Sequence, residues 1–113
     1  MRNQTRNTVL GGAVDVADSS QKRRTGLLKH TGLEEGEGLW ILPCESVHTF
    51  FMKFAIDLVY MDKKNKVRKV CRAVPPWRLS ACLSAHSIIE LPAGTIERTG
   101  TQPGDELSIE KLH

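Results

Sequence analysis

The segment near the middle of the chain constrains the fold most, because two apolar runs flank one strongly hydrophilic turn. Ile56 to Met61 forms the first run, and Val67, Val70 and Val74 mark the second. The turn between them reads Asp62-Lys63-Lys64-Asn65-Lys66. Since β-branched and aromatic residues favour strands, and a short polar stretch between two such runs is typical of a hairpin, the sequence predicts a hairpin from Ile56 to Val74.

The other apolar segments are short and lie between glycine, proline and polar turn signals. Strands are expected at Thr8–Leu10, Val14–Ala17, Leu39–Leu42, Thr49–Phe54 and Ser87–Leu91, and from Leu107 onwards with one buried face. Asp18, Ser19 and Ser20 offer capping oxygens for a main helix from Gln21 to His30. A single helical turn is expected at Thr95–Thr99.

Recurrent crossover helices are missing from this pattern, which argues against a parallel α/β layer. The sequence therefore predicts a mainly β (α+β) fold. We expect a compact barrel-like or strongly curled, mostly antiparallel sheet with one main short helix. With 113 residues, the chain should form a single domain over residues 1–113.

The chain has no apolar run that approaches the roughly 20 residues needed to span a bilayer. Its start, MRNQTRNTVLGG, lacks the apolar stretch of a secretory leader, so a cytoplasmic location is expected. Three cysteines, Cys44, Cys71 and Cys82, form no C-x-x-C pair. Reduced thiols are the expectation for such a protein.

Basic residues exceed acidic ones by 16 to 13, a net charge of +3 that does not by itself imply a polyanionic partner. They gather at Lys22–Arg24 and along residues 62–72. We interpret the second cluster as a lysine-protected edge of the hairpin. Nucleic-acid binding through this hairpin is an alternative, although the chain has few aromatic residues for stacking on bases.

Thiol and imidazole groups occur together at Cys44 and His48, four positions apart, and such a pair can act as nucleophile and base. On an extended chain, however, the two residues are roughly 13 Å apart. Cys44, His48, Cys71, Cys82 and His86 would also suffice in number for a zinc site assembled from distant segments. None of them shows the close pairing of structural zinc ligands, so no metal or cofactor is expected.

Two carboxylates interrupt apolar strands. Asp57 lies within Phe54–Tyr60, and Glu90 lies within Ile88–Pro92. A buried carboxylate without a partner has a raised pKa and costs several kcal/mol, so each must be paired, clasped by the backbone or functional. Arg24, Lys53 and Arg78 are candidate partners for Asp57.

Eight blocks of residues together resemble the family called domain of unknown function 192, and the resemblance covers roughly Arg23 to Leu107. They are Arg24-Thr25-Gly26-Leu27-Leu28, Gly36-x-Gly38-Leu39-Trp40, Pro43-Cys44, His48-Thr49-Phe50-x-Met52-Lys53-Phe54-x-Ile56-Asp57, Val59-x-Met61-Asp62, Pro76-Trp77-Arg78, Glu90-Leu91-Pro92-Ala93-Gly94-Thr95 and Gly104-Asp105. The resemblance implies a compact, β-dominated domain with no established reaction or cofactor.

We expect a non-enzymatic binding or accessory domain whose groove holds a small polar ligand or a peptide. The residues expected to flank the groove are Met52, Lys53, Asp57, Trp77, Arg78 and Glu90. Tryptophan beside arginine is frequent at recognition surfaces. The competing hypothesis is a small hydrolytic enzyme that uses Cys44 with His48, or Asp57 with Glu90.

Overall fold

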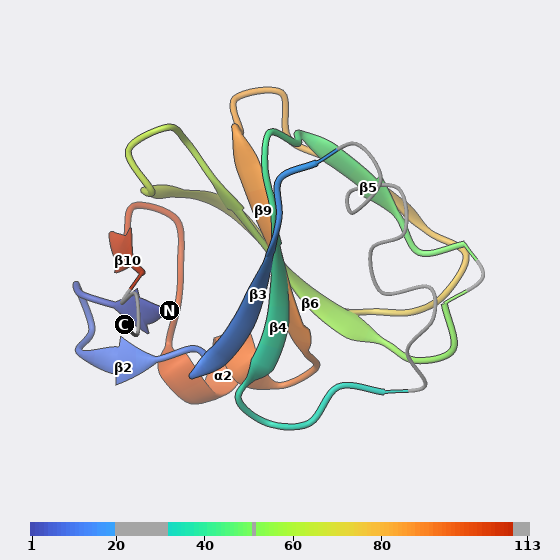
Figure 1. Cartoon of the computed structure of the whole chain (residues 1–113), viewed down its shortest axis with the longest axis horizontal. Coiled ribbons are helices and arrows are strands. Elements are labelled where there is room, and N and C mark those ends of the chain that lie inside the picture. Colours follow the sequence, from blue (N-terminus) through green and yellow to red (C-terminus); the bar gives the residue numbers. More distant parts are fainter. Residues whose placement is uncertain (20–31, 51, 110–113) are drawn as a thin grey trace.

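A computed structural model describes residues 1–19, 32–50 and 52–109. Three sheets make up this part of the chain (Figure 1). The largest has five strands in the order β3-β4-β9-β6-β7, namely Ala13–Ala17, Glu37–Ile41, Ser87–Pro92, Ile56–Met61 and Val67–Val74. All its neighbouring strands are antiparallel except β3 and β4. The mainly β fold class predicted from the sequence is confirmed.

The five-stranded sheet is open, because it ends in β3 on one side and in β7 on the other. It is therefore not a closed barrel. The predicted hairpin is confirmed as β6 and β7, and its cationic strand β7 lies at the edge of the sheet, as expected for a lysine-protected edge. The main helix predicted at Gln21–His30 lies outside the described residues. The helical turn at Thr95–Thr99 is confirmed as α2.

Apolar side chains pack on both faces of the five-stranded sheet. On one face Val59, Met61, Ile89 and Leu91 pack with Ile96 of α2. On the other face the buried cluster comprises Met52, Ile56, Leu58, Tyr60 and Ile88. Because successive residues of a strand point to opposite faces, β6 and β9 supply both clusters and are buried along almost their whole length. With apolar layers on both faces, these strands form the buried centre of the described structure.

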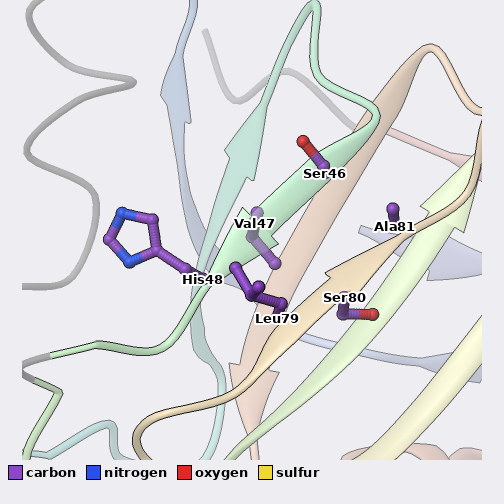
Figure 2. Close-up of a pocket in the computed structure, with 6 residues that line it drawn as sticks. All are labelled: Ser46, Val47, His48, Leu79, Ser80 and Ala81. Atoms are coloured by element: carbon purple, nitrogen blue, oxygen red, sulfur yellow. The ribbon is translucent and has the colours of Figure 1, made fainter.

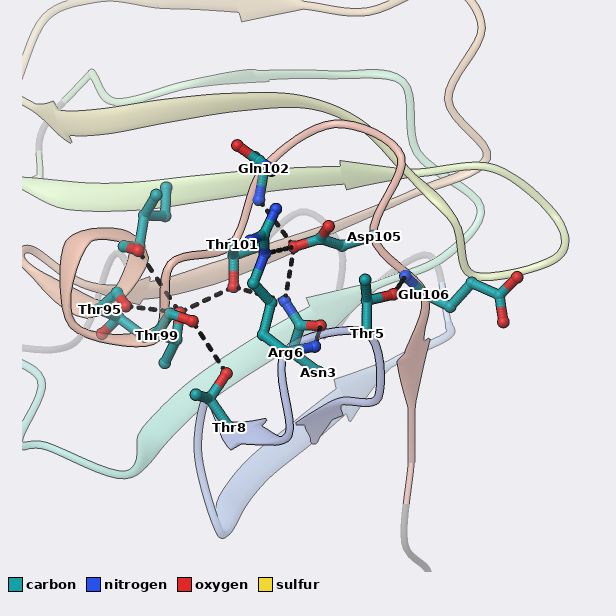
Figure 3. Close-up of polar contacts among 11 residues, drawn as sticks. Asn3, Thr5, Arg6, Thr8, Thr95, Thr99, Thr101, Gln102, Asp105 and Glu106 are labelled. Carbon is teal, nitrogen blue, oxygen red and sulfur yellow. Dashed lines mark hydrogen bonds and ion pairs between the residues drawn. The ribbon is translucent and has the colours of Figure 1, made fainter.

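A small three-stranded sheet packs at one end of the molecule, in the order β10 (Leu107–Ser108), β1 (Arg2–Asn3) and β2 (Thr8–Val9). Figure 3 shows the polar network that ties it to α2. Asp105 accepts hydrogen bonds from Asn3 Nδ2 at 2.9 Å and from Arg6 Nε at 3.1 Å. Although burial opposes its ionisation, these bonds and one from the backbone N–H of Gln102 lower the pKa of Asp105. This cluster is satisfied internally and is architectural.

The third sheet is a two-stranded antiparallel ribbon of β5 (Ser46–His48) and β8 (Leu79–Ala81). The strand expected at Thr49–Phe54 is wrong: β5 ends at His48, and no described residue from 49 to 55 lies in a strand. The Thr49 carbonyl accepts the backbone N–H of Met52 at 3.2 Å and that of Trp77 at 3.1 Å. These bonds close a turn that the aromatic composition of the segment does not reveal.

Within the described ranges, the structure has no helix that is both long enough and apolar enough to cross a membrane.

Candidate functional site

Asp57 is fully buried on β6, and backbone groups satisfy its carboxylate. Oδ1 accepts a hydrogen bond from the N–H of Ala73, and Oδ2 accepts one from the N–H of Ile96, both at 2.8 Å. Ala73 has a positive φ of 47° and lies where the register of β7 shifts against β6. Asp57 therefore connects the irregular edge strand β7 to the start of α2 by two hydrogen bonds. Of the roles that the sequence allowed, this is the structural one, through backbone groups.

Glu90 lies on β9 between Leu39 of β4 and Leu58 of β6. Its residue is only 4% exposed, and nothing in the described part of the chain donates a hydrogen bond to its carboxylate or pairs with it. Burial alone raises the pKa of Glu90 to about 7. The carboxyl group is thus poised to change charge near neutral pH, in an environment that favours its neutral form.

The structure does not bring Asp57 and Glu90 together, because their side chains leave the sheet on opposite faces. It does bring Met52, Trp77 and Arg78 together around Thr49. The Thr49 hydroxyl donates to the carbonyl of Pro75 at 2.7 Å and accepts the N–H of Arg78 at 2.9 Å. Lys53 is exposed beside buried Met52.

Three aromatic rings lie in a row from the loop bonded to Thr49 to the end of β5. Phe50 stacks on Trp77 with ring centroids 5.7 Å apart, and His48 lies 5.0 Å from Phe50. Leu79 is directly opposite His48 in the ribbon. The residues of β5 and β8 that alternate with the inward Val47 and Ser80 leave the ribbon on its other side. We call these residues and their flanking aromatic and leucine residues the ribbon face: Ser46, His48, Phe50, Trp77, Leu79, Ala81 and Leu83.

Large apolar side chains of the ribbon face are open to solvent. Trp77 is 58% exposed, Leu79 is 76% exposed and Leu83 is 84% exposed. A hollow of about 420 Å³ lies at the ribbon, lined by Ser46, Val47, His48, Leu79, Ser80 and Ala81. Figure 2 shows these residues on the two strands, with the His48 imidazole projecting from β5. Leu79 both is exposed and lines the hollow, and exposed apolar surface of this kind is typical of an interaction site.

The inner side of the ribbon is anchored to the five-stranded sheet. Tyr60 donates its hydroxyl to Ser80 Oγ at 2.6 Å, and Lys69 Nζ lies 5.5 Å above the Tyr60 ring. Val47 of β5 packs against the cluster that contains Tyr60. Burial raises the pKa of Tyr60 to about 12, although the Ser80 hydrogen bond opposes this shift. The ribbon is therefore attached to the five-stranded sheet through Tyr60 and the apolar cluster around it.

The three cysteines form no disulfide, and each is half-buried against the cluster around Tyr60. Cys44 donates its thiol proton to the carbonyl of Ser46 at 3.0 Å. Cys71 Sγ lies 3.6 Å from Ser80 Oγ, and Cys82 Sγ lies 3.4 Å from Ser84 Oγ. In residues 1–19, 32–50 and 52–109, no group of three or more His, Cys, Asp or Glu side chains is arranged to hold a metal ion.

The sequence did not predict the strand β8, the hydrogen-bonding role of Thr49 or the exposure of Leu79 and Leu83. One signal was available: apolar residues occupy alternate positions at Trp77, Leu79, Ala81 and Leu83. Such alternation predicts a strand, but it normally indicates a buried face, whereas Leu79 and Leu83 point to solvent.

Comparisons with known proteins agree on one family. The family model of domain of unknown function 192, described as "Uncharacterized ACR", matches residues 1–109. The UPF0127 protein of Thermococcus sibiricus is 35% identical over 114 residues, covering 96% of this chain and 73% of that protein. The UPF0127 protein of Pyrococcus horikoshii is 33% identical over 111 residues, and this match covers 93% of this chain and 94% of that protein.

A solved structure supports the fold. The crystal structure of a protein of unknown function from Novosphingobium aromaticivorans superposes with a TM-score of 0.72 at 21% identity, covering 82% of this chain and 71% of that one. This likeness shows the fold alone. The match of the family model over residues 1–109 and the 35% identical relative show the family: the protein belongs to the domain of unknown function 192 family.

Proposed function

We propose that the protein is a non-enzymatic binding domain and that its ribbon face takes up a peptide segment of a partner protein. The exposure of Leu79, of Leu83 and of Trp77, which stacks on Phe50, carries this proposal. Leaving such a surface in water is unfavourable unless a partner covers it, because buried apolar area stabilises by about 25 cal/mol per Å². We also propose that the protein is cytoplasmic.

A peptide is a better fit than a small polar ligand. Of the residues expected to flank a polar groove, Asp57 is clasped by backbone groups and Met52 is buried in the core. Trp77 and Arg78 remain at the surface, at the end of the ribbon. An elongated apolar surface with a hollow of about 420 Å³ suits an extended chain that inserts one side chain.

Panning a phage-displayed library of short peptides against the immobilised protein tests the proposal. We expect enrichment on the wild-type protein and its loss on the double variant Leu79→Ser, Leu83→Ser. The matched control is Val9→Ser, Val16→Ser, which changes two exposed apolar residues on other strands. Equal enrichment on both double variants, or no enrichment on the wild type, would rule out the ribbon face as the binding surface.

A further inference from the structure

Positive charge is concentrated in the part of the chain that contains the ribbon. Residues 44–86 include eight Lys and Arg residues against three Asp and Glu residues, a net charge of +5. The rest of the chain has eight basic and ten acidic residues, a net charge of −2. The overall charge of +3 therefore conceals a strongly cationic segment at residues 44–86.

Acidic side chains do little to neutralise the positive charge of residues 44–86. Asp57 is buried, and Asp62 accepts the backbone N–H groups of Lys64 and Lys66 at 2.8 and 3.0 Å within its own turn. Glu45, directly before β5, is the exposed acidic residue of this segment. In the described part of the chain, the one ion pair between these cations and an acidic side chain joins Lys66 to Glu106 at 4.0 Å. Most of the positive charge is thus available to an external anion.

Three of these cations border the ribbon. Lys69 Nζ donates to the carbonyl of Ala81 at 2.8 Å, and Arg68 Nε lies 3.4 Å from Ser84 Oγ, so both side chains reach from β7 to β8 and its following turn. Arg78 is exposed and lies between Trp77 and Leu79 in the chain. Guanidinium and ammonium groups beside an apolar surface favour a partner that combines carboxylates with apolar side chains.

We propose that the ribbon face binds an acidic peptide segment, in which Asp or Glu residues flank an apolar side chain that enters the hollow. This inference rests on the proposed function and names the chemistry of the partner. The surface is a poor platform for nucleic acid, since Leu79 and Leu83 are aliphatic and the Trp77 ring already stacks on Phe50. Its hollow fits an inserted side chain better than it fits a flat lipid surface.

Two synthetic peptides distinguish the inference from the function on which it rests. Both carry the same central leucine and phenylalanine, and they differ only in flanking Asp and Glu residues in one and Asn and Gln residues in the other. Affinities are measured by fluorescence anisotropy of the labelled peptides at low and high salt. We expect the acidic peptide to bind at least about tenfold more tightly at low salt, with the difference shrinking as salt screens the charges.

Matched charge removals locate the effect. Arg68→Gln, Arg78→Gln should abolish the preference for the acidic peptide. Lys63→Gln, Lys64→Gln removes the same charge from the hairpin turn and should keep the preference. That turn lies beside β10 rather than beside the ribbon, because the N–H of Leu107 donates to the carbonyl of Asn65 at 2.9 Å.

Each other outcome has a definite meaning. If both peptides bind equally and Leu79→Ser, Leu83→Ser abolishes binding, the ribbon face is a peptide site but the acidic partner is wrong. If neither peptide binds, the inference fails, and the panning experiment decides separately whether the ribbon face binds any peptide. If phosphatidylglycerol vesicles or a single-stranded oligonucleotide bind instead, and Arg68→Gln, Arg78→Gln abolishes that binding, the cationic surface serves another class of partner and the inference is overturned.

Discussion

Asp57 and Glu90 lie on adjacent strands one position out of register, so one carboxylate is enclosed on each face of the sheet. Asp57 is opposite Leu91, and Glu90 is opposite Leu58. Two backbone N–H groups satisfy Asp57, whereas nothing in the described part of the chain satisfies Glu90. Two acids in similar sequence settings therefore differ in role: Asp57 maintains the fold, whereas burial raises the pKa of Glu90 to about 7.

Replacing Glu90 with Gln should make the stability of the protein less dependent on pH. The pKa of Glu90 is raised from 4.5 to about 7, so the folded state holds this proton more tightly than the unfolded state does. The stability that Glu90 contributes is therefore complete below pH 4.5 and declines until the pH passes about 7. Above that pH, Glu90→Gln should be more stable than the wild type by up to about 3 kcal/mol.

Urea unfolding at pH 5 and pH 8 measures this difference. Glu45→Gln serves as the control, because Glu45 is exposed and its replacement should change neither curve. A Glu90→Gln variant that is less stable than the wild type at pH 8 would show that a cation pairs with the Glu90 carboxylate in solution.

Asp57→Asn should be destabilising by about 3 kcal/mol, since an amide offers one acceptor oxygen and leaves a buried N–H without a partner. Asp62→Asn is a matched control: Asp62 also accepts two backbone N–H groups, but at the surface, so its loss should cost less than about 1 kcal/mol. Equal losses in urea unfolding of the two variants would contradict the clasp role of Asp57.

Tyr60 is the sole tyrosine of the chain, so the absorbance of tyrosinate reports on it alone. Spectrophotometric titration should give a midpoint near 12 rather than 10, because burial disfavours the phenolate. In Ser80→Ala the midpoint should rise further, since the Ser80 hydrogen bond lowers the pKa of Tyr60. An ordinary midpoint in the folded wild type would mean that the ribbon does not cover Tyr60.

Cys44 tests the hydrolytic alternative. Its thiol proton is donated to the carbonyl of Ser46, and the reactive species of a cysteine is the thiolate, so we expect slow reaction with a disulfide reagent near neutral pH. The three cysteines should react at comparable rates, as assigned by single Cys→Ser variants. A Cys44 that reacts far faster than Cys71 and Cys82, and that slows in His48→Ala, would support a nucleophile and base pair.

Local patterns predicted the centre of the fold. The hairpin of β6 and β7 and the strand β9 were predictable because apolar runs and a polar turn define each of them within a few residues. The pairing of β5 with β8 was not, because it joins segments more than 30 residues apart, and neither strand has an apolar run of its own. The ribbon depends on the turn at Thr49, where one carbonyl accepts two N–H groups.

The candidate site was predictable only in part. Trp77 and Arg78 stood out by their residue types, and the structure puts both at the surface. The role of Asp57 could not be inferred, since it depends on Ile96, 39 residues away, and on the irregular backbone at Ala73. A strand sequence shows that a carboxylate is enclosed, but the register decides which face it occupies and which groups surround it.

The hydrogen bonds of Thr49 have a consequence for the thermodynamics of association. They fix the loop that carries Trp77 and Arg78 to the segment after β5 before any partner arrives. Ordering a loop on binding costs conformational entropy, and a loop whose backbone is fixed in advance avoids that part of the cost. Association at this end of the ribbon should therefore involve little loss of backbone entropy in the protein, leaving the flexible peptide to lose most of it.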